Sequence, residues 1–310
     1  MMQKILITGG TGMIGTALCH YLLKTGYEIT VLTRNPSREK DEPGVRYAAW
    51  DVKTGKIDVE AVKSADYIIH LAGAGVMDHR WSGYYKEEIL ASRTKSSSLL
   101  VHTLKNVSHN VKAIISSSAI GWYGADKHTG HKFIEDDPAS NDFLGQTCLL
   151  WEQSIEAAEK EGIKVCKLRT GIVLSNMGGA LKEFEKPMHF GIGGILGNGK
   201  QIISWIHIDD LCRIFHYCLM HMLSGSFNAV APTPVTNKKL IMTLGTVYRE
   251  KFFIPFHVPS TILKMLLGEK SVEILKSCTV SADKIMATGF RFLFPTVEDA
   301  LTDLYKIKNR

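Results

Sequence analysis

The sequence predicts an α/β fold: a doubly wound parallel sheet with helices on both faces and a smaller C-terminal lobe. An apolar strand at residues 4–7 runs into a glycine-rich turn and an amphipathic helix. A second strand at residues 28–32 follows at the distance that a βαβ unit requires. A further apolar run at residues 66–75 closes in small residues, which is typical of a parallel strand buried on both faces. Strands that alternate with helices in this way favour a parallel sheet.

The chain is long enough for one large domain with a smaller lobe. Its 310 residues are 45% hydrophobic and 22% charged, an ordinary composition for a globular protein. No linker, repeat or low-complexity segment interrupts it, so we expect a sheet domain at residues 1–225 and a closely fused lobe at residues 226–310. The net charge of +6 is dispersed along the chain, which does not indicate nucleic-acid binding.

Cysteine usage and hydropathy set the expected compartment. The six cysteines form no Cys-x-x-Cys pair and no zinc-like Cys/His spacing, so we expect reduced, buried thiols and no metal site. No stretch approaches the roughly 20 apolar residues of a membrane span. The sequence therefore predicts a cytoplasmic protein without a membrane partner.

The glycine-rich turn predicts a Rossmann-type dinucleotide site. Gly9 permits a positive φ, Gly12 lets the backbone approach a pyrophosphate, and Gly15 lets the helix pack closely on the strand. The phosphates would bind the free N–H groups at the positive end of that helix. The alternative is a helix with a merely glycine-rich N-terminus. The candidate cofactor contacts here are Gly9, Thr11, Gly12, Met13, Ile14 and Gly15.

The tip of the second strand indicates which cofactor binds. An Asp or Glu at this place would bind the 2′-hydroxyl of NAD(H), but the chain offers Arg34 and, four residues on, Arg38. Guanidinium groups suit a 2′-phosphate, which favours NADP(H). The alternative is two solvated loop arginines.

The elements that follow complete the expected domain. A third strand is expected at residues 45–50, and the end of the fourth, Leu71, Ala72 and Gly73, should lie under the cofactor, where larger side chains would block it. A long helical pattern at residues 84–104 leads to a fifth strand at residues 111–116, and a sixth lies within residues 164–174. A glycine-rich passage at residues 178–199 supplies a loop on the nicotinamide side.

The last third of the sequence predicts short elements. Residues 204–211 indicate a strand that leads into a helix, with His207 at the junction. We interpret His207 as satisfying loop carbonyls, with a chemical role as the alternative. Helical patterns follow at residues 238–248, 259–267 and 281–288. Residues 289–301 then read as an alternating strand followed by a last helix.

The sequence of the glycine-rich turn resembles that of the extended short-chain dehydrogenase/reductase superfamily, which contains sugar-nucleotide epimerases, dehydratases and reductases. In such proteins the helix at residues 84–104 passes beside the nucleotide, which makes Glu88 and Arg93 candidate polar contacts, with an exposed helical face as the alternative. The segment from Ser116 to Gly124 resembles the superfamily's Ser-Ser-x-x-x-Tyr-Gly stretch. The resemblance implies Ser118 as the catalytic serine, with Ser117 as the fallback.

The superfamily's Tyr-x-x-x-Lys pair, which performs proton transfer, is missing from its expected place. Aligning Glu152 with the glutamate that usually follows the lysine puts Leu144 at the tyrosine position and Cys148 at the lysine position. Neither residue replaces its counterpart as a proton relay. Tyr123 or a water molecule is therefore the candidate substitute, and the spacing of Tyr123 to Lys127 is regarded as accidental.

Several segments together resemble the atypical extended short-chain dehydrogenases that are usually labelled epimerase family proteins, and the resemblance covers essentially the whole chain. Among them are Trp-Ile-His-Ile-Asp-Asp-Leu and the C-terminal Ala-x-Gly-Phe-x-Phe-x-Phe-Pro. The resemblance implies the fold and an NADP(H) site, but no reaction.

Two hypotheses follow for the function. One is an NADP(H)-dependent oxidoreductase or epimerase acting on a small-molecule or nucleotide-linked substrate, and the other is a non-catalytic NADP(H) sensor. A homodimer is left open.

Overall fold

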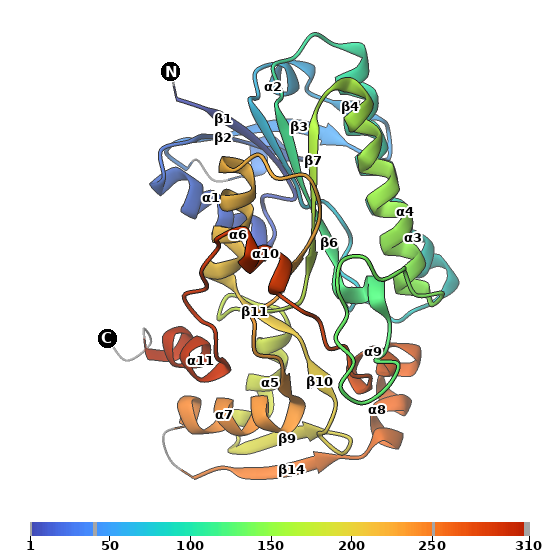
Figure 1. The fold of residues 1–310 in the computed structure, drawn as a ribbon, viewed down its shortest axis with the longest axis vertical. Helices are drawn as coiled ribbons and strands as arrows, with labels where there is room; N and C mark the ends of the chain where they lie inside the picture. Colours follow the sequence, from blue (N-terminus) through green and yellow to red (C-terminus); the bar gives the residue numbers. More distant parts are fainter. Residues whose placement is uncertain (1, 40–41, 250–251, 307–310) are drawn as a thin grey trace.

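The computed structural model describes residues 2–39, 42–249 and 252–306. Within these residues, eight strands form the central sheet in the order β12-β7-β6-β5-β1-β2-β3-β4 (Figure 1). Neighbouring strands are parallel except for the short β4, which pairs antiparallel with β3. The doubly wound parallel sheet is therefore confirmed. The strands are β1 (Lys4–Thr8), β2 (Glu28–Thr33), β3 (Val45–Asp51), β4 (Lys56–Ile57), β5 (Tyr67–His70), β6 (Ala113–Ala119), β7 (Lys164–Thr170) and β12 (Gly225–Ala229).

Helices cover both faces of this sheet. Helices α1 (Met13–Lys24) and α6 (Ile208–Met220) pack together on one face, and α3 (Gly83–Asn106) and α4 (Phe143–Glu156) on the other (Figure 1). Alternation along the strands produces the two cores. In β1, Ile5 and Ile7 belong to the first core and Leu6 to the second.

The strand order places a switch point beside β1. Strand β1 lies between β2 and β5. The connection that follows β1 leads to β2 on one side, whereas the connection that follows β5 leads to β6 on the other side. In open α/β sheets, ligands bind outside the carboxyl ends of the strands at such a point. The glycine turn after β1 and the loop after β5 both start there.

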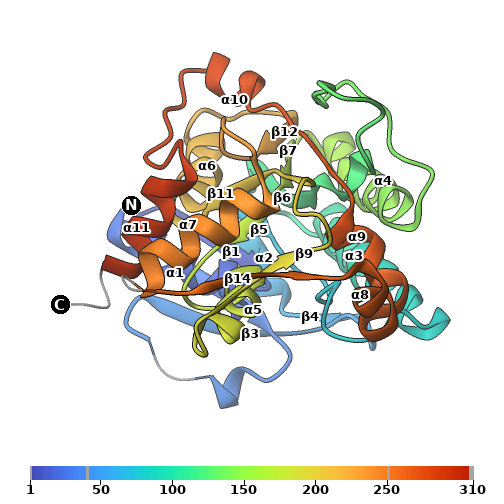
Figure 2. The same cartoon turned by 90° about the horizontal axis from the view of Figure 1, so that it is seen from below.

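A lobe of short elements lies beyond the carboxyl edge of the sheet (Figures 1 and 2). The lobe contains residues from both before and after β12, the last strand of the central sheet. Strand β12 begins at residue 225, at the boundary expected from the sequence. Two pairs of strands, β9 with β14 and β10 with β13, form small separate sheets. Its elements are α5 (Ala180–Met188), β9 (Ile192–Leu196), β10 (Ile202–Ile203), β13 (Val235–Thr236), α7 (Asn237–Arg249), β14 (Ile254–Val258), α8 (Ser260–Leu267), α9 (Ser271–Leu275) and α11 (Val297–Lys306).

The remaining elements connect these parts. The chain predicted as one sixth strand forms two strands, β7 and β8, and β8 pairs with β11 outside the central sheet. In the described residues, no helix has the length and apolar character that crossing a membrane requires. The connecting elements are α2 (Val59–Lys63), β8 (Ile172–Leu174), β11 (Trp205–His207) and α10 (Asp283–Ala287).

The strand predicted after residue 289 is wrong. Residues 290–294 are irregular, although Phe290, Phe292 and Phe294 alternate as they would in a strand. The buried carboxylate of Asp210 accepts hydrogen bonds from the backbone N–H groups of Leu293 and Phe294, at 2.9 Å each. A side chain of α6 thus takes the place of a neighbouring strand.

Candidate functional site

The turn after β1 forms a tight backbone cradle. Gly9 has a φ of +71°, and a Cβ there would lie 2.9 Å from the carbonyl carbon of Leu71. A Cβ on Gly15 would lie 2.3 Å from the carbonyl oxygen of Gly9. Both positions therefore exclude any side chain, for the two reasons predicted from the sequence: a positive φ and close packing of helix on strand.

The N-terminus of α1 opens from this cradle. Gly12 is its N-cap residue and offers no side-chain cap, so the amides of Met13 and Ile14 need another acceptor. The cradle leaves the backbone bare on this side, because a Cβ on Gly12 would meet only the Gly9 carbonyl oxygen, at 3.4 Å. Thr11 lies exposed beside it. These residues fit a pyrophosphate, which would accept the amide hydrogen bonds.

A buried polar network holds the loop after β5 against β1. The Thr8 hydroxyl accepts the N–H groups of Leu71 and Ala72 at 3.2 Å and lies 2.7 Å from His70 Nδ1. His70 Nε2 lies 3.1 Å from the Ser97 hydroxyl of α3, and burial lowers the pKa of His70 to about 4. A neutral ring thus links both strands with α3. Sequence reasoning missed this network, whose only signal was a histidine inside an apolar strand.

Arg34 lies exposed at the end of β2, at the carboxyl edge. Thr33, one residue before it, donates its hydroxyl to Glu39, which ties the following turn to the strand. Among the described residues, neither Arg34 nor Arg38 makes a side-chain hydrogen bond or ion pair with a protein group. Both guanidinium groups are therefore available to a ligand.

Of the two candidates on α3, only Arg93 is placed against the predicted cofactor edge by its contacts. A Cβ on Gly73 would lie 3.2 Å from the Arg93 guanidinium carbon, and that carbon lies 5.0 Å from the Trp151 ring centroid. Arg93 also donates to the carbonyl oxygen of Ile89, and burial lowers its pKa. Glu88 is half-buried, without a side-chain hydrogen bond or ion pair in the part of the chain described.

Ser118 points into the protein. Its hydroxyl donates to Glu152 at 2.7 Å, and only 2% of the residue is exposed. Arg169 binds the same carboxylate in a bidentate pair, through Nε at 2.9 Å and Nη2 at 3.0 Å. This arrangement argues against Ser118 as the catalytic serine and favours a structural role that links β6, α4 and β7.

Tyr123 belongs to the same network. Its hydroxyl donates to Asn228 at 2.6 Å and accepts from Arg169 Nη1 at 3.1 Å. Burial is the largest effect on the Tyr123 phenol and raises its pKa above the usual value, whereas a proton relay needs a lowered one. Lys127 is exposed, and its ammonium lies over the Phe133 ring, 5.9 Å from the centroid, with no hydrogen bond to the Tyr123 hydroxyl among the described residues. The geometry therefore argues against Tyr123 as the substitute relay.

The end of β6 that faces α4 carries Ala119, which has no hydroxyl. The Cys148 thiol lies 3.7 Å from the Ala119 carbonyl oxygen and is buried, which raises its pKa to about 12. Leu144 closes the same space, because a Cβ on Gly121 would lie 3.2 Å from its Cβ. The positions expected to carry tyrosine and lysine thus hold an apolar side chain and a protonated thiol against the strand.

His207 caps the helix α6. Its Nδ1 accepts the N–H of Asp209 at 3.1 Å, so the neutral ring carries its proton on Nε2, which lies 3.5 Å from Asp303 Oδ2. These three side chains form one group spaced as metal ligands within the described residues. A metal ion would need the lone pair that the Nε2 proton occupies, so the geometry favours a structural role. In that role His207 accepts a backbone N–H, which differs from the binding of loop carbonyls interpreted from the sequence.

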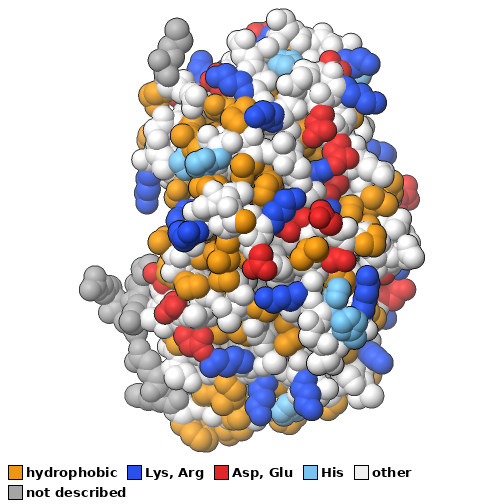
Figure 3. Space-filling view, in the orientation of Figure 1, with side chains coloured by type: hydrophobic (Ala, Val, Ile, Leu, Met, Phe, Trp, Pro, Cys, Tyr) orange, Lys and Arg blue, Asp and Glu red, His pale blue; other side chains and the backbone are white. Residues whose placement is uncertain are grey.

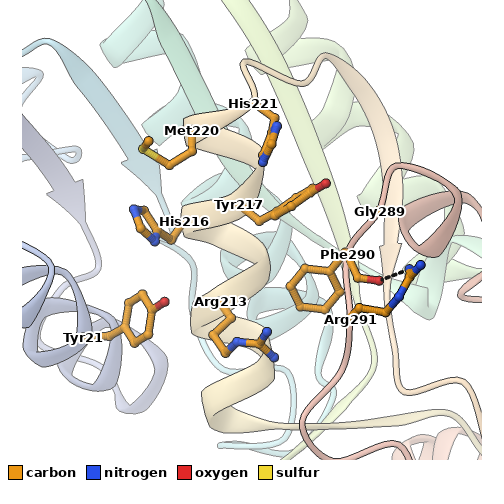
Figure 4. Close-up of a pocket in the computed structure, with 9 residues that line it drawn as sticks. All are labelled: Tyr21, Arg213, His216, Tyr217, Met220, His221, Gly289, Phe290 and Arg291. Atoms are coloured by element: carbon orange, nitrogen blue, oxygen red, sulfur yellow. Dashed lines mark hydrogen bonds between the residues drawn. The ribbon is translucent and has the colours of Figure 1, made fainter.

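A surface pocket of about 420 Å³ lies away from this edge, between α1, α6 and residues 289–291 (Figure 4). Phe290, Tyr217 and Tyr21 supply most of its aromatic lining, and Arg213 and Arg291 supply its guanidinium groups. Tyr21 lies eight residues beyond Met13, roughly 12 Å along α1 at 1.5 Å per residue. The pocket is thus separate from the glycine cradle.

The fold and the cradle define a dinucleotide-binding α/β protein, and comparison with known proteins gives the family. The model of the NAD dependent epimerase/dehydratase family matches residues 5–229, and a domain of unknown function (DUF1731) matches residues 258–304. The chain belongs to the NAD dependent epimerase/dehydratase family, as an atypical extended short-chain dehydrogenase/reductase.

Relatives and solved structures agree with this assignment. The chain is 35% identical to an epimerase family protein of Staphylococcus saprophyticus over 98% of this chain and 99% of the relative, and 34% identical to one of Staphylococcus aureus over 98% and 100%. The structure of human epimerase family protein SDR39U1 (isoform 2) with NADPH is similar at a TM-score of 0.84 and 28% identity, covering 98% of this chain and 99% of that one. A nucleoside-diphosphate sugar epimerase of Corynebacterium glutamicum gives a TM-score of 0.76 at 28% identity, covering 99% of this chain and 59% of the other.

Proposed function

We propose that this chain binds NADP(H) along the carboxyl edge of the sheet. The glycine cradle and the uncapped N-terminus of α1 supply the pyrophosphate site, and Arg34 supplies a free guanidinium for the 2′-phosphate. The human relative with NADPH supports this choice of cofactor. The observation that carries the proposal is Arg34, exposed where NAD(H) proteins present a carboxylate.

Fluorescence titration of Arg34→Asp tests the cofactor proposal. The variant removes a bidentate phosphate partner and adds a ribose acceptor, so we expect weaker NADPH binding by about tenfold or more and unchanged or tighter NADH binding. Lys105→Asp, at an exposed cation near the end of α3 without an ion pair among the described residues, serves as the charge-reversal control. Equal NADPH affinity in wild type and Arg34→Asp would show that other residues hold the 2′-phosphate.

At the nicotinamide end, the residues favour a binding protein that responds to NADP(H) over an epimerase that uses the family's tyrosine and lysine. Ala119, Leu144 and Cys148 offer no group that titrates near neutral pH, and Ser118 and Tyr123 are engaged inside the protein. Without a positioned acid or base, proton transfer loses the roughly 10²–10⁴-fold that such a group supplies. We therefore propose a sensor that reports cofactor state through its lobe.

Arg93 favours a second function, an NADPH-dependent oxidoreductase acting on a small or nucleotide-linked carbonyl substrate. Its guanidinium lies beside Gly73 and has no carboxylate partner among the described residues. A cation there would stabilise the negative charge that develops on a carbonyl oxygen as hydride reaches its carbon, and water would then supply the proton.

Turnover distinguishes the two functions. Purified protein is given NADPH with a panel of nucleotide sugars and small carbonyl compounds, and absorbance at the nicotinamide band is followed. The sensor function predicts no oxidation above background, together with different hydrogen-exchange protection of the lobe in NADPH and NADP⁺. The oxidoreductase function predicts turnover that Arg93→Met lowers by about a hundredfold. Lys95→Met, at an exposed residue of the same helix, should leave that turnover unchanged.

A further inference from the structure

The outer end of the lobe exposes large apolar side chains. Six of them, which we call the apolar tip, come from the residues just before β9, from β14 and the segment before it, and from α8, at the lower end of the molecule in Figure 1. Phe190 is 84% exposed and Phe252 80%, values that give these rings no packing role inside the chain. Soluble proteins rarely expose such clusters without a binding function. The apolar tip consists of Phe190, Phe252, Ile254, Phe256, Met265 and Leu266.

The tip lies in chain segments that contain no acidic residue. Neither residues 186–208 nor residues 252–268 hold an Asp or Glu, whereas they carry Lys186, Lys200 and Lys264. Lys186 pairs with Glu183, but Lys264 has no ion pair within the described residues. Arg249 lies beside Gly191, between Phe190 and Ile192, and donates to the His189 carbonyl oxygen. Figure 3 shows hydrophobic side chains at this end with Lys and Arg next to them.

A second copy of the chain fits this surface poorly. An isologous contact places a patch against itself, and a patch with cations but no acids would bring like charges together. The sequence neighbours Glu250 and Lys251 cancel each other in charge and lie outside the described residues.

Strand addition to β14 is also disfavoured. Ile254 donates its N–H to Gly191, and Val258 accepts from the N–H of Gly197, so these residues face β9. The free edge is therefore formed by Pro255 and His257, and proline has no N–H to donate. Proline on an edge strand is a common device against pairing with another strand.

We propose that the apolar tip docks on the surface of an anionic lipid bilayer, with its phenylalanines in the interface and Lys264 and Arg249 at the headgroups. Apolar side chains that face outward from one end of a molecule, accompanied by cations, match the composition of interfacial membrane anchors. Such a contact lies on the membrane surface and does not span the bilayer. It departs from the expectation, drawn from the sequence, that the protein has no membrane partner. The outward apolar face of α8, Ile262, Met265 and Leu266 at helical spacing, extends the same surface.

Co-sedimentation of the full chain with vesicles tests the proposal. Vesicles of phosphatidylcholine with about 30% phosphatidylglycerol should bind wild-type protein at least about tenfold more than phosphatidylcholine alone, and salt should weaken the binding. The double variant Phe190→Gln/Phe252→Gln should lose about tenfold or more, because it removes two exposed rings without disturbing the core. Lys264→Glu should weaken binding to the anionic vesicles.

Tyr84→Gln is the matched control, because Tyr84 is 76% exposed on α3, outside the tip. It should bind vesicles as wild type does, and circular dichroism should show all variants folded. Three results would overturn the proposal: no binding to anionic vesicles, equal loss in Tyr84→Gln and the double variant, or a dimer in light scattering that the double variant dissociates. The last would assign the tip to a second copy.

Discussion

Gly15 shows how one residue shapes the proposed cofactor site. Because a Cβ there would meet the Gly9 carbonyl oxygen at 2.3 Å and Gly10 Cα at 2.5 Å, Gly15→Ala must push α1 away from the turn. We expect about 1–3 kcal/mol of lost stability and at least about tenfold weaker NADPH binding. Urea unfolding and fluorescence titration measure the two effects. Gly83→Ala, at a helical glycine with nothing within 4 Å, should lower neither.

Tyr123→Phe separates a structural tyrosine from a catalytic one. The change removes the hydrogen bond to Asn228 and leaves Arg169 Nη1 with one acceptor fewer, so we expect about 1–3 kcal/mol of destabilisation. NADPH affinity, measured by titration, should stay within about twofold of wild type, because the ring is buried and its hydroxyl is bound to Asn228 of β12 and Arg169 of β7, which lie beyond β6 from the glycine cradle. A folded variant that binds NADPH but loses a turnover present in wild type would restore Tyr123 as a catalytic residue.

His70 makes stability depend on pH. Burial lowers its folded-state pKa from 6.5 to about 4, so between these values the unfolded chain binds a proton that the folded chain does not. Stability should therefore fall as pH drops from about 6.5 to 4, by about 3 kcal/mol in total from this group. The free energy of unfolding of wild type and His70→Gln, measured across this range, should converge toward low pH. Parallel pH profiles in the two proteins would show that His70 does not carry the effect.

At the scale of elements, Asp210 fastens residues 290–294 to α6. Its carboxylate is fully buried and accepts from Leu293, Phe294 and Arg213. Asp210→Asn turns one acceptor oxygen into a donor that faces other donors, and we expect a loss of about 3 kcal/mol or more in urea unfolding. Asp209→Asn, at the adjacent exposed position, should cost less than about 0.5 kcal/mol. Similar losses in both variants would contradict this assignment.

The secondary-structure elements also differ in how well the sequence predicts them. Strands β1, β2, β3, β5 and β6 are predicted close to their bounds. For β1 and β5 the reason is that a parallel strand buried on both faces is continuously apolar. Strand β12 escapes prediction, since Gly-Ser-Phe-Asn-Ala has little strand propensity and its place beside β7 comes from tertiary contacts. For residues 290–294 the prediction fails in the opposite way. Three alternating phenylalanines give the pattern of a strand, but the backbone N–H groups bind the Asp210 carboxylate and not a neighbouring strand.

For the whole molecule, the predictable part of the site is the part made by backbone. The glycines predict the cradle, because only glycine fits its backbone. The NADP(H) prediction needs only the position of Arg34 at the end of a strand. Side-chain direction is different: successive residues such as Ser117 and Ser118 point to opposite faces of β6, but the sequence does not show that Glu152 binds the Ser118 hydroxyl. The apolar tip depends on which faces the lobe covers, which hydropathy along the chain does not show.

The structure of the complex with NADPH tests the central claim most directly, which is that NADP(H) binds at a site without an internal proton relay. We predict the pyrophosphate on the amides of Met13 and Ile14, the 2′-phosphate on Arg34, and no hydroxyl or amine side chain within about 3.2 Å of a carbonyl oxygen placed at nicotinamide C4. A pyrophosphate bound away from the cradle would contradict the account. A tyrosine, serine or lysine in hydrogen-bond reach of that oxygen would contradict it equally.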